Sequence, residues 1–89
     1  GLCGWYNASC AMFYTYVLKS EIDGKFYIGH SSNLRQRFTA HNKGLVESTA
    51  KRRPLILVYY EACLNQESAI KREKYFKTGF GRRFLRERI

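Results

Sequence analysis

Two tyrosines, Tyr16 and Tyr27, stand eleven residues apart on either side of an Asp-Gly sequence at residues 23–24. Each belongs to a short apolar segment typical of a strand, and Asp-Gly between two such segments indicates a β-hairpin. The pair therefore predicts two phenol groups on neighbouring strands. Arg37 and His41 follow one helical turn apart on the next segment. Two phenols, a guanidinium and an imidazole together suit a site that handles a phosphate group.

The balance of charge indicates which molecule carries that phosphate. The 89 residues include 16 Lys and Arg against 7 Asp and Glu, a formal net charge of +9. This excess favours a polyanionic partner, and nucleic acid is expected rather than an acidic membrane surface. A solvated basic surface without a specific partner is the alternative reading of the same charge.

The three cysteines show no C-x-x-C spacing and no matching histidines, so a zinc site is not expected. An odd number of thiols fits a reducing compartment better than a disulfide scaffold, which predicts a cytoplasmic protein. The longest apolar run, residues 55–60, is too short to span a bilayer. Residues 1–11 lack a regular apolar period, so we expect a disordered leader or extension there and a single domain over residues 12–89.

The hydrophobic pattern predicts elements of both kinds. The expected strands lie at about 13–19, 25–29 and 55–60. The expected helices lie at about 33–43, 66–77 and 82–88. The third strand is apolar throughout, which predicts a central strand buried on both faces. The resulting fold class is α+β, a small, mainly antiparallel three-stranded sheet flanked by helices in the order β-β-α-β-α-α.

Local signals at the helix ends support these boundaries. Ser31, Ser32 and Asn33 offer an N-cap for the first helix and Asn65 offers one for the second, because Ser and Asn side chains accept a hydrogen bond from an unpaired amide of the first turn. Gly44 fits the C′ position that ends the first helix. Gly79 and Gly81 are expected to interrupt the helical conformation between the second and the last helix.

Polar side chains on otherwise apolar helix faces are the candidate site residues. Leu34, Phe38 and His41 share one face of the first helix, and Arg37 lies on the same stripe. Glu73 falls in the middle of the inward stripe of the second helix. A carboxylate there must be paired, metal-bound or protonated. The structural alternatives are a snorkelling arginine with a satisfied core histidine, and a salt bridge from the glutamate to Arg37 or a neighbouring lysine.

In this order the residues resemble the GIY-YIG nuclease superfamily, and its small single-domain bacterial members in particular. The second motif of the family is present unchanged as Tyr-Ile-Gly at residues 27–29. The first motif is matched at residues 14–16, where Tyr-Thr replaces Gly-Ile ahead of the tyrosine. The arginine and histidine of the first helix match the family's helix, and Glu73 matches its metal-binding glutamate. The match spans about residues 13–77 and is expected to include the last helix.

The resemblance implies a metal-dependent nuclease that hydrolyses phosphodiester bonds in nucleic acid, with DNA as the expected substrate. On this view Glu73 would hold Mg²⁺ or Mn²⁺, and Arg37 would neutralise the transition state. Tyr16 would activate the attacking water, and Tyr27 would position the water or the phosphate. His41 would either relay the proton or act as the base itself, and the sequence leaves both roles open.

Other basic residues have no apolar spacing and belong to the surface. Some are expected to follow a phosphate backbone, where each contact adds salt dependence without sequence preference. The candidate nucleic-acid-binding residues are His30, Lys51, Arg52, Arg53, Lys74 and Lys77. Two further functions are open: a non-catalytic nucleic-acid-binding module that keeps the nuclease fold, and a protein-interaction domain whose basic face meets an acidic partner.

Overall fold

The computed structural model describes residues 12–89, so the expectation for residues 1–11 lies outside the described residues. The elements, in chain order, are β1 (Phe13–Ser20), β2 (Phe26–Ser31), α2 (Leu34–Asn42), α3 (Glu47–Ala50), β3 (Leu55–Cys63), α4 (Gln66–Phe76) and α5 (Gly79–Arg86). All three strands pair antiparallel in one sheet, which confirms the α+β class. In this part of the chain, no helix is long and apolar enough to cross a membrane.

Local chemistry sets the hairpin and the helix starts as expected. Gly24 has a φ of +69°, which an Asp-Gly turn requires, and the Asp23 carboxylate accepts the Lys25 amide at 2.9 Å. The side chains of Asn33 and Asn65 each accept a hydrogen bond from an amide three residues on, at 3.0 and 2.8 Å. These caps fix where α2 and α4 begin.

The central strand is β1, so the prediction that the third strand is central was wrong. The order is β2-β1-β3, and β3 lies at an edge with Ile56 43% and Tyr60 53% exposed. By contrast, four consecutive residues of β1, from Thr15 to Leu18, are buried. An apolar run predicts burial of both faces only where helices cover both faces along its whole length, and β3 is covered only in part.

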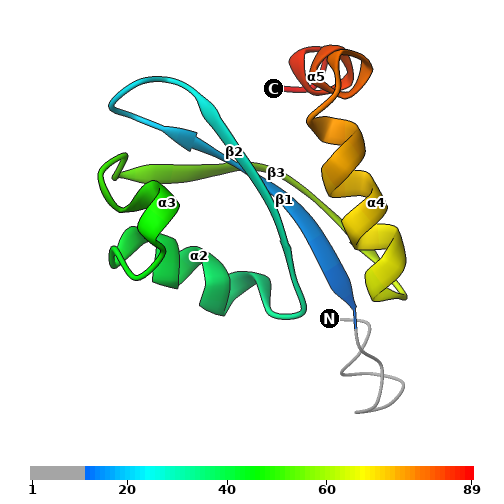
Figure 1. Cartoon of the computed structure of the whole chain (residues 1–89), viewed down its shortest axis with the longest axis horizontal. Coiled ribbons are helices and arrows are strands. Elements are labelled where there is room, and N and C mark those ends of the chain that lie inside the picture. Colours follow the sequence, from blue (N-terminus) through cyan, green and yellow to red (C-terminus); the bar gives the residue numbers. More distant parts are fainter. Residues whose placement is uncertain (1–11) are drawn as a thin grey trace.

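Helices α2 and α3 lie on one side of the sheet and α4 and α5 on the other (Figure 1), and a small core forms on each side. On the face covered by α2, Tyr16, Leu18 and Leu55 form a cluster that Leu34 and Phe38 pack against. On the face covered by α4 and α5, the buried cluster is Val17, Phe76 and Leu85. Alternate residues of β1 thus serve opposite cores, as strand geometry dictates.

Two helices differ from the sequence-based expectation. The short helix α3 was not predicted, so the order is β-β-α-α-β-α-α. The last helix begins at Gly79 rather than after the glycines, because the Thr78 hydroxyl caps it by accepting the Gly81 amide at 3.2 Å. Gly81 is buried where α5 meets α4: a Cβ there would lie 2.0 Å from the Tyr75 carbonyl oxygen. That glycine therefore allows the close approach of two helices and does not break one.

Candidate functional site

The glycine of the Tyr-Ile-Gly motif makes room for the first tyrosine. Tyr16 on β1 lies opposite Gly29 on β2 in the strand register. A Cβ on Gly29 would stand 2.6 Å from the Tyr16 hydroxyl oxygen and 2.7 Å from the ring carbon that bears it. Tyr27 lies on the same face of the hairpin, with its ring centroid 6.4 Å from that of Tyr16. The motif thus sets two phenols side by side.

A buried hydrogen-bond chain runs from Tyr16 through His41 to Thr49. The Tyr16 hydroxyl oxygen lies 2.9 Å from His41 Nε2, and His41 Nδ1 lies 2.7 Å from the Thr49 hydroxyl oxygen. Thr49 donates its own proton to the Val46 carbonyl oxygen at 3.4 Å, so it accepts the Nδ1 proton of His41. Nε2 is then the acceptor for the Tyr16 hydroxyl proton. The three side chains are almost completely buried.

Burial sets the protonation states along this chain. It lowers the pKa of His41 to about 4, and the nearby positive charge of Arg37 contributes to the same shift. His41 is therefore a neutral acceptor near pH 7. Burial also raises the pKa of Tyr16, and the Arg37 guanidinium beside the phenol partly opposes that change. The proton accordingly rests on Tyr16 and points at His41.

The buried imidazole predicts a pH dependence of stability. Its pKa is about 4 in the folded protein against 6.5 for an ordinary histidine, so the unfolded chain takes up its proton first as the pH falls. Stability contributed by neutral His41 is complete above about pH 6.5 and is lost toward pH 4, by at most about 1.4 kcal/mol per pH unit. NMR titration of the histidine ring signals, assigned with a His30→Gln variant, should show neutral His41 at about pH 6. An ordinary titration of His41 would contradict the buried acceptor.

Glu73 on α4 is a paired carboxylate, which was one of the expected alternatives. Its two oxygens lie 2.6 Å from His30 Nδ1 and 2.9 Å from Lys77 Nζ. Burial acts to raise the pKa of Glu73, but the hydrogen bonds from His30 and Lys77 outweigh it, so the pKa lies below its usual value. The carboxylate is ionised near neutral pH and only partly shielded from solvent.

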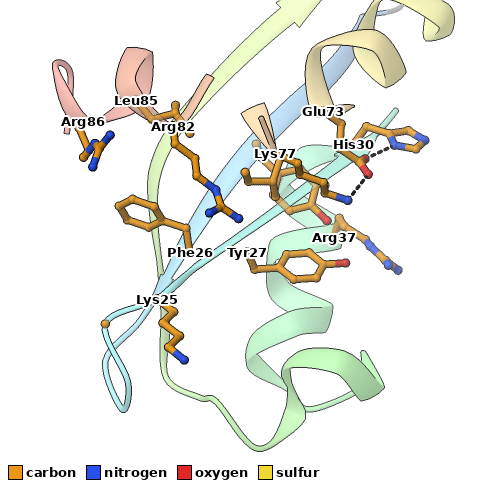
Figure 2. A pocket seen from close by; sticks show the side chains of 14 residues that line it. Lys25, Phe26, Tyr27, His30, Arg37, Glu73, Lys77, Arg82, Leu85 and Arg86 are labelled. Atoms are coloured by element: carbon orange, nitrogen blue, oxygen red, sulfur yellow. Dashed lines mark hydrogen bonds and ion pairs between the residues drawn. The ribbon is translucent and has the colours of Figure 1, made fainter. Parts of the chain in front are cut away.

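These groups meet in a pocket of about 820 Å³ that wraps around edge strand β2 (Figure 2). Tyr16, Tyr27, Arg37 and Glu73 line it, whereas His41 lies behind Tyr16 and reaches the pocket only through that phenol. The structure thus brings four of the five predicted catalytic residues to one pocket at the edge of the sheet and places the fifth one hydrogen bond away. Tyr16, Tyr27 and Arg37 reach this pocket from the face covered by α2, and Glu73 reaches it from α4, which covers the other face.

Of the six predicted nucleic-acid-binding residues, two lie at the pocket and four do not. His30 and Lys77 line the pocket, and both contact Glu73. Arg52 instead binds the Asp23 carboxylate at 3.1 Å near the hairpin turn, and Arg53 donates to the Ala50 carbonyl oxygen. Lys51 and Lys74 are exposed and are not among the residues that line this pocket.

Further pocket cations were missing from that sequence-based set. They are Lys25 in the hairpin turn and Arg82 and Arg86 on α5. The two arginines are four residues apart, the spacing that places side chains on one helical face. That spacing can be read from the sequence. The predicted helix began after Gly81, however, and so the side of the helix that faces the pocket was not predicted. Thr49 was also missed, because a single polar residue on a four-residue helix carries no pattern.

A divalent cation would need more than protein ligands at this site. The part of the chain that the structure describes holds no group of three or more His, Cys, Asp or Glu side chains able to bind a metal. Glu73 nevertheless fits Mg²⁺, which is often held by one carboxylate together with substrate phosphate oxygens and waters. The carboxylate is ionised and faces a pocket that can admit such oxygens.

Comparison with known proteins identifies related sequences. A family model described as the GIY-YIG catalytic domain matches residues 12–86. A UPF0213 protein of Pediococcus acidilactici is 43% identical over 68 residues, covering 73% of this chain and 68% of the relative. UPF0213 proteins of Staphylococcus haemolyticus (36% identical; 76% of this chain, 83% of the relative) and Clostridium perfringens (42%; 74% and 71%) are similar too. No solved structure gives a significant match.

Proposed function

The chain belongs to the GIY-YIG family, and from that premise we propose that it is a metal-dependent endonuclease that hydrolyses phosphodiester bonds, with DNA as its substrate. The observation that carries the proposal is the buried Tyr16–His41–Thr49 chain, which ends at a pocket lined by Arg37 and Glu73. A proton acceptor, a guanidinium and an ionised carboxylate around one cavity are the groups that phosphodiester hydrolysis needs.

Tyr16 is the residue we assign to the attacking water. Its hydroxyl proton is committed to His41, so the phenol oxygen has lone pairs left to accept a hydrogen bond from a water in the pocket. As that water attacks, Tyr16 takes its proton while the phenol proton moves toward His41. His41 is fully buried and acts through Tyr16, which favours the relay role over direct contact with water.

Arg37 and Glu73 serve the phosphate. Arg37 lines the pocket beside Tyr16 and offers a planar set of donors to the oxygens that gain charge during attack. Glu73 would hold Mg²⁺ or Mn²⁺, which when bound withdraws charge from the phosphate and the leaving oxygen. Because the described residues supply one carboxylate here, we expect the cation to bind firmly only together with nucleic acid.

The charge of the pocket supports a polyanionic substrate. Among the described residues, its lining includes five Lys and Arg side chains, Lys25, Arg37, Lys77, Arg82 and Arg86, against the carboxylate of Glu73. Cations on both sides of a catalytic centre can hold successive phosphates of one strand. Binding should therefore weaken steeply with salt, because each phosphate contact releases counterions.

One observation favours the alternative of a non-catalytic binding module. Both oxygens of Glu73 are engaged by His30 and Lys77, which is the arrangement that a purely structural glutamate would show. A cleavage panel separates the two functions. Branched, duplex and single-stranded DNA and RNA are incubated with and without Mg²⁺ or Mn²⁺. Metal-dependent nicking would support the nuclease, and salt-sensitive binding without cleavage would support the module.

Replacing Tyr16 with Phe should lower the cleavage rate by about a hundredfold or more, because the hydroxyl that contacts the water is removed. The variant leaves the buried Nε2 of His41 without a partner, which costs about 1–3 kcal/mol of stability. Tyr14→Phe is the matched control, since Tyr14 lies two residues earlier on the same face of β1 and is not among the residues lining this pocket. Equal activity of both variants, with both folded, would remove Tyr16 from the mechanism.

A further inference from the structure

Phe26 is an apolar ring placed in a strongly basic environment. It is the first residue of edge strand β2, is 37% exposed and lines the catalytic pocket. It belongs to neither of the two hydrophobic cores. Within residues 12–89, Tyr75, Phe76 and Phe84 of α4 and α5 pair with one another and with Arg72 or Arg88, whereas no ring or cation is paired with Phe26. The ring is therefore partly exposed at the pocket and free of an aromatic or cationic partner there.

Cations surround this ring at one end of the pocket. Figure 2 shows Phe26 with Lys25 on one side of it and the α5 residues Arg82 and Arg86 on the other, while Glu73 lies toward the opposite end with His30 and Lys77. The carboxylate is held by its own partners there. The Phe26 end of the pocket therefore combines an exposed aromatic face with several positive charges, a combination typical of sites that bind single-stranded nucleic acid.

We propose that Phe26 is a base-stacking residue, on which an unpaired base of the substrate lies while Lys25, Arg82 and Arg86 hold the phosphates beside it. The inference rests on the proposed function, since the same strand would continue along the pocket to Tyr16 and Arg37. In a continuous duplex both faces of each base are covered by neighbouring bases, so only an unpaired base can offer a face to the ring. The substrate is accordingly nucleic acid with unpaired nucleotides next to the cleaved bond.

Binding of DNA without metal ions tests the stacking directly, because no cleavage is needed. The probes are a short fluorescein-labelled single strand, the matching duplex, and a strand carrying 2-aminopurine, whose emission falls when the base stacks. Phe26→Leu should weaken single-strand binding by about fivefold or more and reduce the 2-aminopurine quenching. Phe26→Trp should retain both, because it restores an aromatic face.

Two controls separate stacking from general effects. Phe80→Leu alters a ring that is 76% exposed on α5 and is not among the pocket residues, so its binding should match wild type. Arg86→Gln should weaken single-strand and duplex binding alike and lower the salt dependence, as expected for a phosphate contact. Thermal melts of every variant show whether the fold is retained.

The outcomes distinguish this inference from the proposed function. Selective loss of single-strand binding in Phe26→Leu with recovery in Phe26→Trp supports stacking, even if no metal condition gives cleavage. Unchanged single-strand binding in a folded Phe26→Leu protein would overturn it, as would an equal loss on duplex DNA or recovery of neither signal in Phe26→Trp. Cleavage confined to fully paired duplex would also overturn it while leaving the nuclease function in place.

Discussion

Replacing Glu73 with Gln is expected to lower metal-dependent nicking by about a thousandfold or more. The substitution is nearly isosteric but removes the negative charge that attracts a cation, and bound metal contributes several kcal/mol of transition-state stabilisation. Binding of DNA in metal-free buffer should persist, because the pocket cations remain and one carboxylate is lost. The measurement is the nicking rate of supercoiled plasmid across a range of Mg²⁺ and Mn²⁺ concentrations.

A stability measurement separates a catalytic Glu73 from a structural one. Lys77 is half-exposed, so its ion pair with Glu73 contributes about 1 kcal/mol or less. We therefore expect a small fall in melting temperature at neutral pH, similar to that of Glu67→Gln, which alters an exposed glutamate in the first turn of α4. Full activity of Glu73→Gln would eliminate the metal role. Lost activity together with a collapsed melt would identify Glu73 as a structural ion-pair partner.

Arg37 also lines this pocket and acts on the protonation of its neighbours. Its guanidinium lies beside Tyr16 and influences the pKa of both Tyr16 and His41. In the proposed mechanism the same side chain would neutralise the phosphate and adjust the proton acceptor, which would couple the two halves of the site. The carboxylate end and the phenol end are therefore parts of one electrostatic unit, although the five residues come from four elements and His41 reaches the pocket only through Tyr16.

The candidate catalytic residues could be selected from the sequence because they stand out in short local patterns. Glu73 and His41 are polar groups on apolar helical stripes, and the tyrosine pair flanks an Asp-Gly turn, so short-range periodicity was sufficient. The partners of these residues were harder to predict. Thr49 meets His41 through tertiary packing of a four-residue helix, and His30 meets Glu73 across 43 positions of sequence. Contacts of that kind leave no periodic signal.

For the fold, too, features set by local chemistry were predicted correctly and features set by tertiary contacts were not. The hairpin and the caps of α2 and α4 depend on local backbone chemistry and were correctly predicted. The position of β3 in the sheet depends on which strand the helices leave uncovered, and its composition could not show this. Gly81 was misread for a related reason: low helix propensity indicates a break, whereas the contact between α4 and α5 requires the missing side chain.

That contact leads to the largest expected effect on stability. In Gly81→Ala the new methyl group would lie 2.0 Å from the Tyr75 carbonyl oxygen and 2.6 Å from Phe76 Cα. Both are backbone atoms, so no side-chain rotation relieves the clash and α5 must move away from α4. The movement separates buried Leu85 from Phe76. We expect a loss of about 3 kcal/mol or more, a fall in melting temperature of roughly 12 °C or more for a domain of this size.

Gly79→Ala is the matched control, because it lies on the same helix and a Cβ there meets no atom within 4 Å. It should melt at or slightly above the wild-type temperature, since alanine favours helix over glycine. Gly81→Ala should also weaken DNA binding where it remains folded, because Arg82 and Arg86 reach the pocket only while α5 is seated on α4. Equal melting temperatures for the two variants would show that α5 can shift without cost. The helix contact would then play no part in placing the pocket arginines.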